Sequence, residues 1–118
     1  MTPRRLLALA AFAALIPPAF AASPFDGQWQ GTAEGSGRNC PSGRVQFSII
    51  DGDALGHASL GEGGGTIRGH VEADGSFHGT LALAARTAAI TGSLAGDAFT
   101  GSWAYGSCLV KATLSRAK

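Results

Sequence analysis

The chain has 118 residues and a formal net charge of +1, and 14% of its residues are charged. Residues 22–118 carry seven Lys and Arg against eight Asp and Glu, with no basic cluster, so nucleic acid and anionic lipid are not expected as partners. The 18 glycines, and the lack of any helical periodicity longer than one turn, favour strands divided by turns.

Residues 1–21 have the pattern of a cleaved secretory signal peptide. Two arginines give a positive start, residues 6–16 are uncharged and apolar, and residues 19–21 offer the small-x-small pattern that a signal peptidase cleaves. The apolar run is shorter than the roughly 20 residues of a membrane helix. We therefore expect residues 22–118 to form one exported domain, periplasmic or extracellular, with no membrane insertion after cleavage.

Period-2 alternation of apolar residues predicts eight short strands in this domain. An apolar-x-Gly-x-apolar pattern recurs in four of them, for example at Phe99, Gly101 and Trp103. The expected strands lie near residues 26–34, 44–50, 53–60, 65–72, 76–83, 88–95, 98–105 and 108–115.

Four turns between these strands have recognisable signatures. Asp51-Gly52 fits a two-residue hairpin turn in which both residues have positive φ. Ala73-Asp74-Gly75 fits a three-residue turn with a left-handed glycine, and the pairs Gly96-Asp97 and Gly106-Ser107 fit two-residue turns that begin with glycine. Each signature fixes which residues of the two flanking strands lie opposite each other.

Two looser loops, taken as four residues each at 61–64 and 84–87, complete the predicted register. One row of mostly side-chain-free positions then crosses seven strands on the apolar face: Phe47, Gly56, Gly69, Gly79, Gly92, Gly101 and Ala112. Such a row lets a sheet coil tightly, because small barrels are filled by alternating large and small residues. We predict an all-β fold, an eight-stranded antiparallel up-and-down meander closed into a small barrel.

The two cysteines provide a test of barrel closure. Cys40 lies between the first and second expected strands, and Cys108 begins the eighth. A closed barrel brings these positions together at one end, whereas a flat sheet would hold them about 28 Å apart, beyond disulfide reach. Because paired cysteines in an exported chain usually form a disulfide, we expect a Cys40–Cys108 bond.

At Gly27-Gln28-Trp29 the chain resembles the calycin group, which comprises lipocalins, avidins and small bacterial metalloprotease inhibitors. The resemblance implies a meander barrel over residues 25–115 with a ligand at its open mouth or, as in the inhibitors, an N-terminal segment that reaches into a protease. Where an avidin carries a biotin-binding Asn, this chain has Gln30-Gly31, and the Tyr and Ser of the avidin third strand are not matched in residues 54–59. Biotin binding is therefore not predicted.

Three histidines are the candidate metal ligands. His70 and His78 are expected to face each other across a hairpin on the outer surface, with His57 diagonal to His70. Zinc takes three or four ligands at about 2.0–2.1 Å, and we expect no carboxylate beside these rings to fix their tautomers. We interpret the three histidines as solvated surface residues rather than as a metal site.

No motif in the sequence supports catalysis. The glycine run at residues 61–65 lacks the helix and the Lys-Ser/Thr of a phosphate loop. Residues 56–61 match a nucleophile elbow in composition alone. Asp51 and Asp53 lie at a turn, where carboxylates bond to the backbone. We expect no enzymatic activity and no cofactor.

Four aromatic residues lie on the apolar face or its rim: Trp29, Phe99, Trp103 and Tyr105. They form either the packed core of a small barrel or a pocket for a small apolar ligand above the glycines. Our leading hypothesis is an interaction module of the cell envelope or medium with an unknown protein partner. The alternatives are a calycin-type carrier of a small apolar ligand and an inhibitor of an exported protease acting through residues 22–26 or the 35–43 loop.

Overall fold

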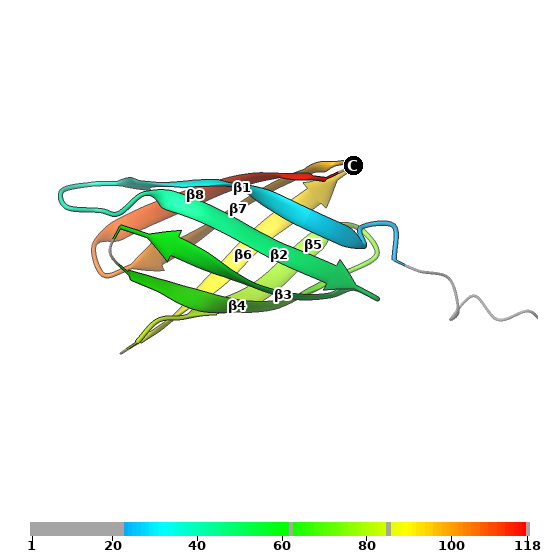
Figure 1. Cartoon of the computed structure of the whole chain (residues 1–118), viewed down its shortest axis with the longest axis horizontal. Coiled ribbons are helices and arrows are strands. Elements are labelled where there is room, and N and C mark those ends of the chain that lie inside the picture. Colours follow the sequence, from blue (N-terminus) through cyan, green and yellow to red (C-terminus); the bar gives the residue numbers. More distant parts are fainter. Residues whose placement is uncertain (1–22, 62, 85, 118) are drawn as a thin grey trace, which may run out of the picture.

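The computed structural model describes residues 23–61, 63–84 and 86–117, so the expected signal peptide lies outside the described residues. Within them, every strand pairs antiparallel with its neighbours in the chain, and the first strand also pairs with the last, which closes a barrel (Figure 1). The strands are β1 (Gly27–Ser36), β2 (Gly43–Ile50), β3 (Asp53–Leu60), β4 (Gly63–Val71), β5 (Ser76–Ala82), β6 (Thr87–Ala95), β7 (Ala98–Tyr105) and β8 (Cys108–Arg116). The predicted closed meander is confirmed, and it is consistent with a calycin-like architecture.

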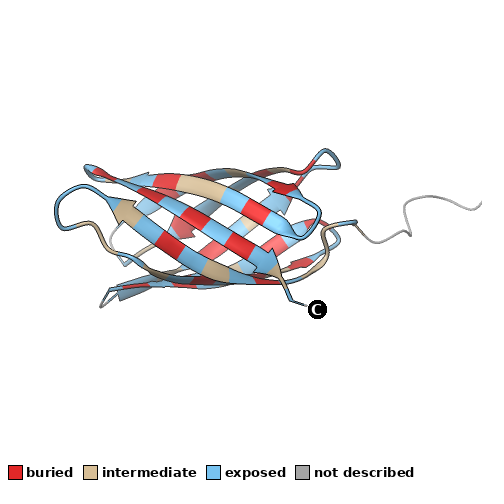
Figure 2. Cartoon of the chain, turned by 90° about the horizontal axis from the view of Figure 1, so that it is seen from above, coloured by how far each residue is buried: buried red, intermediate tan, exposed pale blue. Residues whose placement is uncertain are grey.

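Buried and exposed residues alternate along the strands, as Figure 2 shows. The alternation arises because successive side chains of a strand point to opposite faces of the barrel wall. The described interior holds apolar side chains alone, and the largest of them are Trp29, Phe77, Phe99, Ile49, Ile67, Leu81 and Val110. No helix of the described residues is long and apolar enough to cross a membrane.

Three phenylalanine rings from β2, β5 and β7 meet across the interior. The ring centroids of Phe47, Phe77 and Phe99 lie 5.2 to 5.6 Å from one another. Glycines on the same strand or on an adjacent strand leave room for these rings. A Cβ added at Gly69 would lie 2.5 Å from Cζ of Phe77, and one added at Gly101 would lie 2.6 Å from Cζ of Phe99. The rings therefore fill space that the glycines leave open.

The four signature-bearing turns have the expected lengths. Asp51 and Gly52 have φ of 52° and 84°, and Gly75, Gly96 and Gly106 also have positive φ. The alignments that depend on these turns are confirmed: Phe47 with Gly56, Gly69 with Gly79, Gly92 with Gly101, and Gly101 with Ala112.

The two alignments that relied on the looser loops are wrong by two residues. Gly56 lies opposite Ile67 rather than Gly69, and Gly79 lies opposite Ile90 rather than Gly92. The row of glycines is therefore displaced by two residues between β3 and β4 and again between β5 and β6. Because side chains alternate with a period of two, a two-residue shift leaves every side chain on its expected face of the wall.

The β3–β4 connection is tighter than expected. Leu60 pairs with Gly63, and Gly61 has a φ of 59°, close to the values of Gly96 and Gly106 in the glycine-first turns. Residues 61–62 carry the same Gly-x signature, and the glycine run that follows them hid it. In the β5–β6 connection the loop has four residues as expected, but it spans 83–86.

The meander gives the barrel two different ends. The closed end, at the right in Figure 1, comprises the segment 23–26 and the β2–β3, β4–β5 and β6–β7 turns. The mouth, at the left, comprises the β1–β2, β3–β4, β5–β6 and β7–β8 connections.

At the closed end the segment 23–26 is fastened to the barrel. Nε1 of Trp29 donates a hydrogen bond of 2.9 Å to the carbonyl of Phe25. The Asp26 carboxylate accepts hydrogen bonds from the backbone N–H groups of Asp51 and Gly52, at 2.9 and 3.3 Å. Phe25 packs against the core.

Arg116, the last residue of β8, joins this segment to the β6–β7 turn. Nη1 donates to the carbonyls of Pro24 and Asp26, at 2.8 and 3.1 Å, and Nη2 lies 2.8 Å from the Asp97 carboxylate. The guanidinium carbon also lies 5.2 Å from the centroid of the Trp29 ring. The closed end is thus held by a network centred on one cation.

Candidate functional site

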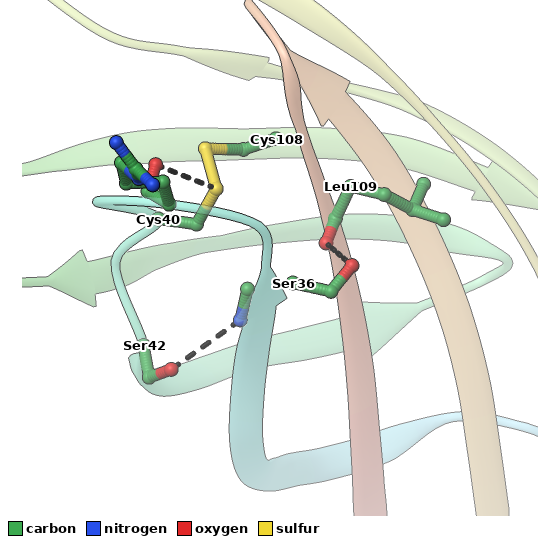
Figure 3. The surroundings of a disulfide bond; sticks show 7 residues. Ser36, Cys40, Ser42, Cys108 and Leu109 are labelled. Atoms are coloured by element: carbon green, nitrogen blue, oxygen red, sulfur yellow. Dashed lines mark hydrogen bonds between the residues drawn. A yellow bond between two sulfur atoms is a disulfide. The ribbon is translucent and has the colours of Figure 1, made fainter.

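A disulfide holds the β1–β2 loop against the start of β8 at the mouth. Cys40 and Cys108 are bonded with their Cα atoms 5.5 Å apart (Figure 3), which confirms the predicted pair. Ser36 Oγ donates to the carbonyl of Leu109 at 3.2 Å, and Ser42 Oγ accepts from the N–H of Gly35 at 3.3 Å. The bond is consistent with an oxidising, exported location.

An apolar pocket of about 210 Å³ lies at the mouth beside this loop. Its lining comes from the β1–β2 and β5–β6 loops and from four strands: Pro41, Leu60, Gly63, Gly64, Leu83, Trp103, Tyr105 and Val110. Gly63 pairs with the inward-facing Leu60, and a Cβ at Gly63 would meet no atom closer than 4.0 Å. Gly63, at the start of β4, therefore leaves the mouth partly empty.

Trp103, one of the lining residues, carries a buried polar atom without a described partner. Its side chain is 3% exposed, and Nε1 has no hydrogen-bond partner among the described residues. A buried donor without an acceptor costs about 1–3 kcal/mol. An acceptor brought from outside the protein would recover part of this cost.

The rim of the pocket carries a cation. The Arg86 guanidinium carbon lies 4.9 Å from the centroid of the Tyr105 ring, and the Arg86 side chain is exposed. The loop that carries it is closed by a 2.8 Å hydrogen bond from the N–H of Leu83 to the carbonyl of Arg86. Arg86 is therefore positioned next to a pocket wall, with its side chain exposed.

The structure brings together two of the four aromatic residues singled out from the sequence. Trp103 and Tyr105 line the pocket, whereas Trp29 lies at the closed end and Phe99 lies in the phenylalanine cluster. Among the residues of the pocket and its rim that sequence reasoning missed, four are side-chain-bearing residues beside the loops: Pro41, Leu60, Leu83 and Arg86. A signal was available, since all four belong to mouth connections or to the strand positions beside them.

The histidine prediction is partly wrong. His70 lies opposite His78, as expected, but His57 lies opposite Thr66 and is not diagonal to His70. The cause is the two-residue shift between β3 and β4. His57 instead bonds through Nε2 to Nε2 of Gln46, at 3.0 Å.

The expected lack of a carboxylate beside these histidines is also wrong. The Asp53 carboxylate lies 3.0 Å from Nδ1 of His70, so its role is not confined to the turn backbone. This hydrogen bond raises the pKa of His70, and the charge of Glu72 adds to the rise. No group of three or more His, Cys, Asp and Glu in the described part of the chain is arranged to hold a metal ion.

A larger depression of about 440 Å³ lies on the outer wall over β1, β2 and β3, with side chains that include Gln30, Arg44, Gln46 and His57. These side chains are exposed, and none is a buried polar group without a partner. The mouth pocket is smaller, but it combines apolar walls with a lining residue, Trp103, whose N–H is unsatisfied, which makes it the stronger candidate for ligand binding.

No known protein family matches the chain, and neither the curated proteins nor the solved structures include one that is significantly similar to it.

Proposed function

We propose that this protein is an exported, non-enzymatic binding module, periplasmic or extracellular, that holds an apolar group with a hydrogen-bond acceptor in its mouth pocket. The observation that carries the proposal is the buried Nε1 of Trp103, which lacks an acceptor in the described part of the protein. Apolar walls with a few placed polar groups are typical of ligand sites.

The size of the pocket favours a short occupant. Small-molecule sites usually begin at about 300 Å³, and this pocket measures about 210 Å³. Farther inside, the phenylalanine rings occupy the barrel. A single side chain or a short tail of a partner fits these dimensions better than a whole lipid, which favours an interaction module over a calycin-type carrier.

An inhibitor that acts through its N-terminal segment has less support. Residues 23–26 are bonded to the closed end through Phe25, Asp26 and Arg116. A segment that must enter a protease cleft would first have to break these contacts.

The proposal can be tested with the fluorescence of Trp103. In a Trp29→Phe protein, Trp103 is the one tryptophan that remains of the two in the chain. We expect N-acetyl-leucinamide, which has an apolar side chain and carbonyl acceptors, to shift its emission in a saturable way.

Two leucine variants in the same background locate the site. Gly63→Leu places a side chain in the pocket and abolishes the shift, whereas Ala104→Leu adds the same side chain at an exposed position of β7 and preserves it. Thermal unfolding confirms that both variants are folded. A saturable shift that persists in Gly63→Leu, or the lack of any shift in the starting protein, would contradict the proposal.

A further inference from the structure

Charge is distributed unevenly between the two ends of the barrel. The closed end carries six carboxylates, from the segment 23–26 and its three turns: Asp26, Asp51, Asp53, Glu72, Asp74 and Asp97. At the mouth the described loops and first strand residues carry Arg38, Arg44 and Arg86, while Glu34 pairs across strands with Lys111. Glu62 belongs to a mouth connection but lies outside the described residues.

This asymmetry leaves the mouth positive, even when Glu62 is included by its sequence position. The closed end is negative, since Arg116 is the one cation bonded there within the described residues. A field of this kind attracts anions to the mouth and repels them from the closed end.

Arg86 contacts a residue of the pocket wall and is not paired with a described carboxylate. Its observed side-chain contact is with the face of Tyr105, and the residue is exposed. Arg116 has the same kind of stacking on Trp29 but is also paired with Asp97. The comparison identifies Arg86 as a cation available to a ligand.

Resting on the proposed function, we infer that the group bound in the mouth pocket belongs to an apolar carboxylate. Its apolar part occupies the pocket, and its carboxylate stays at the rim beside Arg86. A guanidinium presents paired N–H donors that match the two oxygens of a carboxylate. The basic mouth would also speed association with such an anion.

This chemistry has two sources. An apolar side chain next to a carboxylate occurs at the C-terminus of a protein chain, and it also occurs in a small free apolar acid. Both place one short apolar group in a pocket of about 210 Å³ and one negative charge at its rim.

The test compares an anion with its neutral counterpart. N-acetyl-leucine and N-acetyl-leucinamide share the apolar side chain and the acetyl carbonyl, and they differ in the charge. We expect the wild-type protein to bind N-acetyl-leucine about three- to tenfold more tightly, as measured by calorimetry at low ionic strength. The preference declines as salt is added, because salt screens exposed charges.

Arg86→Gln tests the residue, and Arg44→Gln is its matched control. Arg44 is an exposed arginine on β2 that does not line the mouth pocket. We expect Arg86→Gln to bind both compounds with the same affinity and Arg44→Gln to keep the preference. A preference that survives in Arg86→Gln would overturn the assignment of that residue.

The outcomes distinguish a failure of the carboxylate inference from a failure of the pocket proposal. Equal binding of both compounds by the wild-type protein overturns the carboxylate inference and leaves the pocket proposal standing. Binding of neither compound contradicts both. If the inference holds, Ac-Ala-Ala-Leu with a free or amidated C-terminus and 4-methylpentanoate identify the source, because a C-terminal ligand favours the free peptide and a small-acid ligand favours 4-methylpentanoate.

Discussion

The two ends of the barrel each enclose a tryptophan and each place an arginine over an aromatic ring, yet they differ in what satisfies those groups. At the closed end, the N–H of Trp29 bonds to Phe25, and Arg116 is paired with Asp97. At the mouth, the N–H of Trp103 lacks a described acceptor, and Arg86 is paired with no described carboxylate. The comparison shows which polar groups the fold satisfies internally and which it leaves without a described partner.

The largest expected effect on stability comes from removing the disulfide that holds the mouth. Replacing both Cys40 and Cys108 by serine removes a bond that joins residues separated by 68 positions. We expect a loss of about 4 kcal/mol in the free energy of unfolding, because the unfolded chain gains loop entropy. Urea denaturation measures it, and a reducing agent should affect the wild-type protein but not the variant. A loss below about 1 kcal/mol would mean that non-covalent contacts hold the mouth.

Alanine substitutions at two glycines compare the packing of the filled interior with the packing of the mouth. Gly69→Ala brings a methyl group to 2.5 Å from the Phe77 ring, and we expect a loss of about 2 kcal/mol from overpacking. At Gly63 the same methyl group enters open space, so we expect a change within about 0.5 kcal/mol. Equal effects in thermal unfolding would refute the claim that the two regions are packed differently.

The next prediction compares the contributions of Arg116 and Arg86 to stability. Arg116→Gln loses an ion pair and carbonyl contacts at the closed end, and we expect it to cost about 1.5 kcal/mol, given that the pair is partly exposed. Arg86→Gln should change stability by less than about 0.5 kcal/mol. Urea denaturation of both variants provides the measurement. A larger loss of unfolding free energy for Arg86→Gln would assign that residue a structural role and refute the contrast between the two arginines.

The smallest effect is a pH dependence near the closed end. The Asp53 hydrogen bond raises the pKa of His70. The resulting stability is present in full below the ordinary histidine pKa of about 6.5 and is lost as the pH rises through the raised value. We expect Asp53→Asn to lower the NMR titration midpoint of His70 more than Glu72→Gln does. An unchanged midpoint in Asp53→Asn would show that the hydrogen bond is not formed in solution.

Most of the fold could be predicted because each short turn has a local signature. Asp51-Gly52 and the glycine-first turns constrain φ at single residues, and those constraints fix long-range pairing without knowledge of the core. The β3–β4 register failed because the same signature at 61–62 stands beside further glycines. The error propagated to His57, whose neighbours depend on that register.

The candidate site was less predictable for a physical reason. Alternation identifies Trp103 as inward-facing, but it does not reveal whether an indole N–H finds an acceptor. Trp29 and Trp103 look equivalent in the sequence, and their difference arises from residues 23–26, which fold over one end of the barrel. Arg86 was not identified because its stacking on Tyr105 depends on the conformation of a four-residue loop.

The difference between the two tryptophans can be followed by NMR of their indole N–H groups in the wild-type protein as N-acetyl-leucine is added. The account predicts that the Trp103 resonance moves downfield in a saturable way, because its N–H gains an acceptor, and that the Trp29 resonance stays in place. A Trp103 resonance that does not move while N-acetyl-leucine binds, or a Trp29 resonance that moves in its stead, would contradict the account.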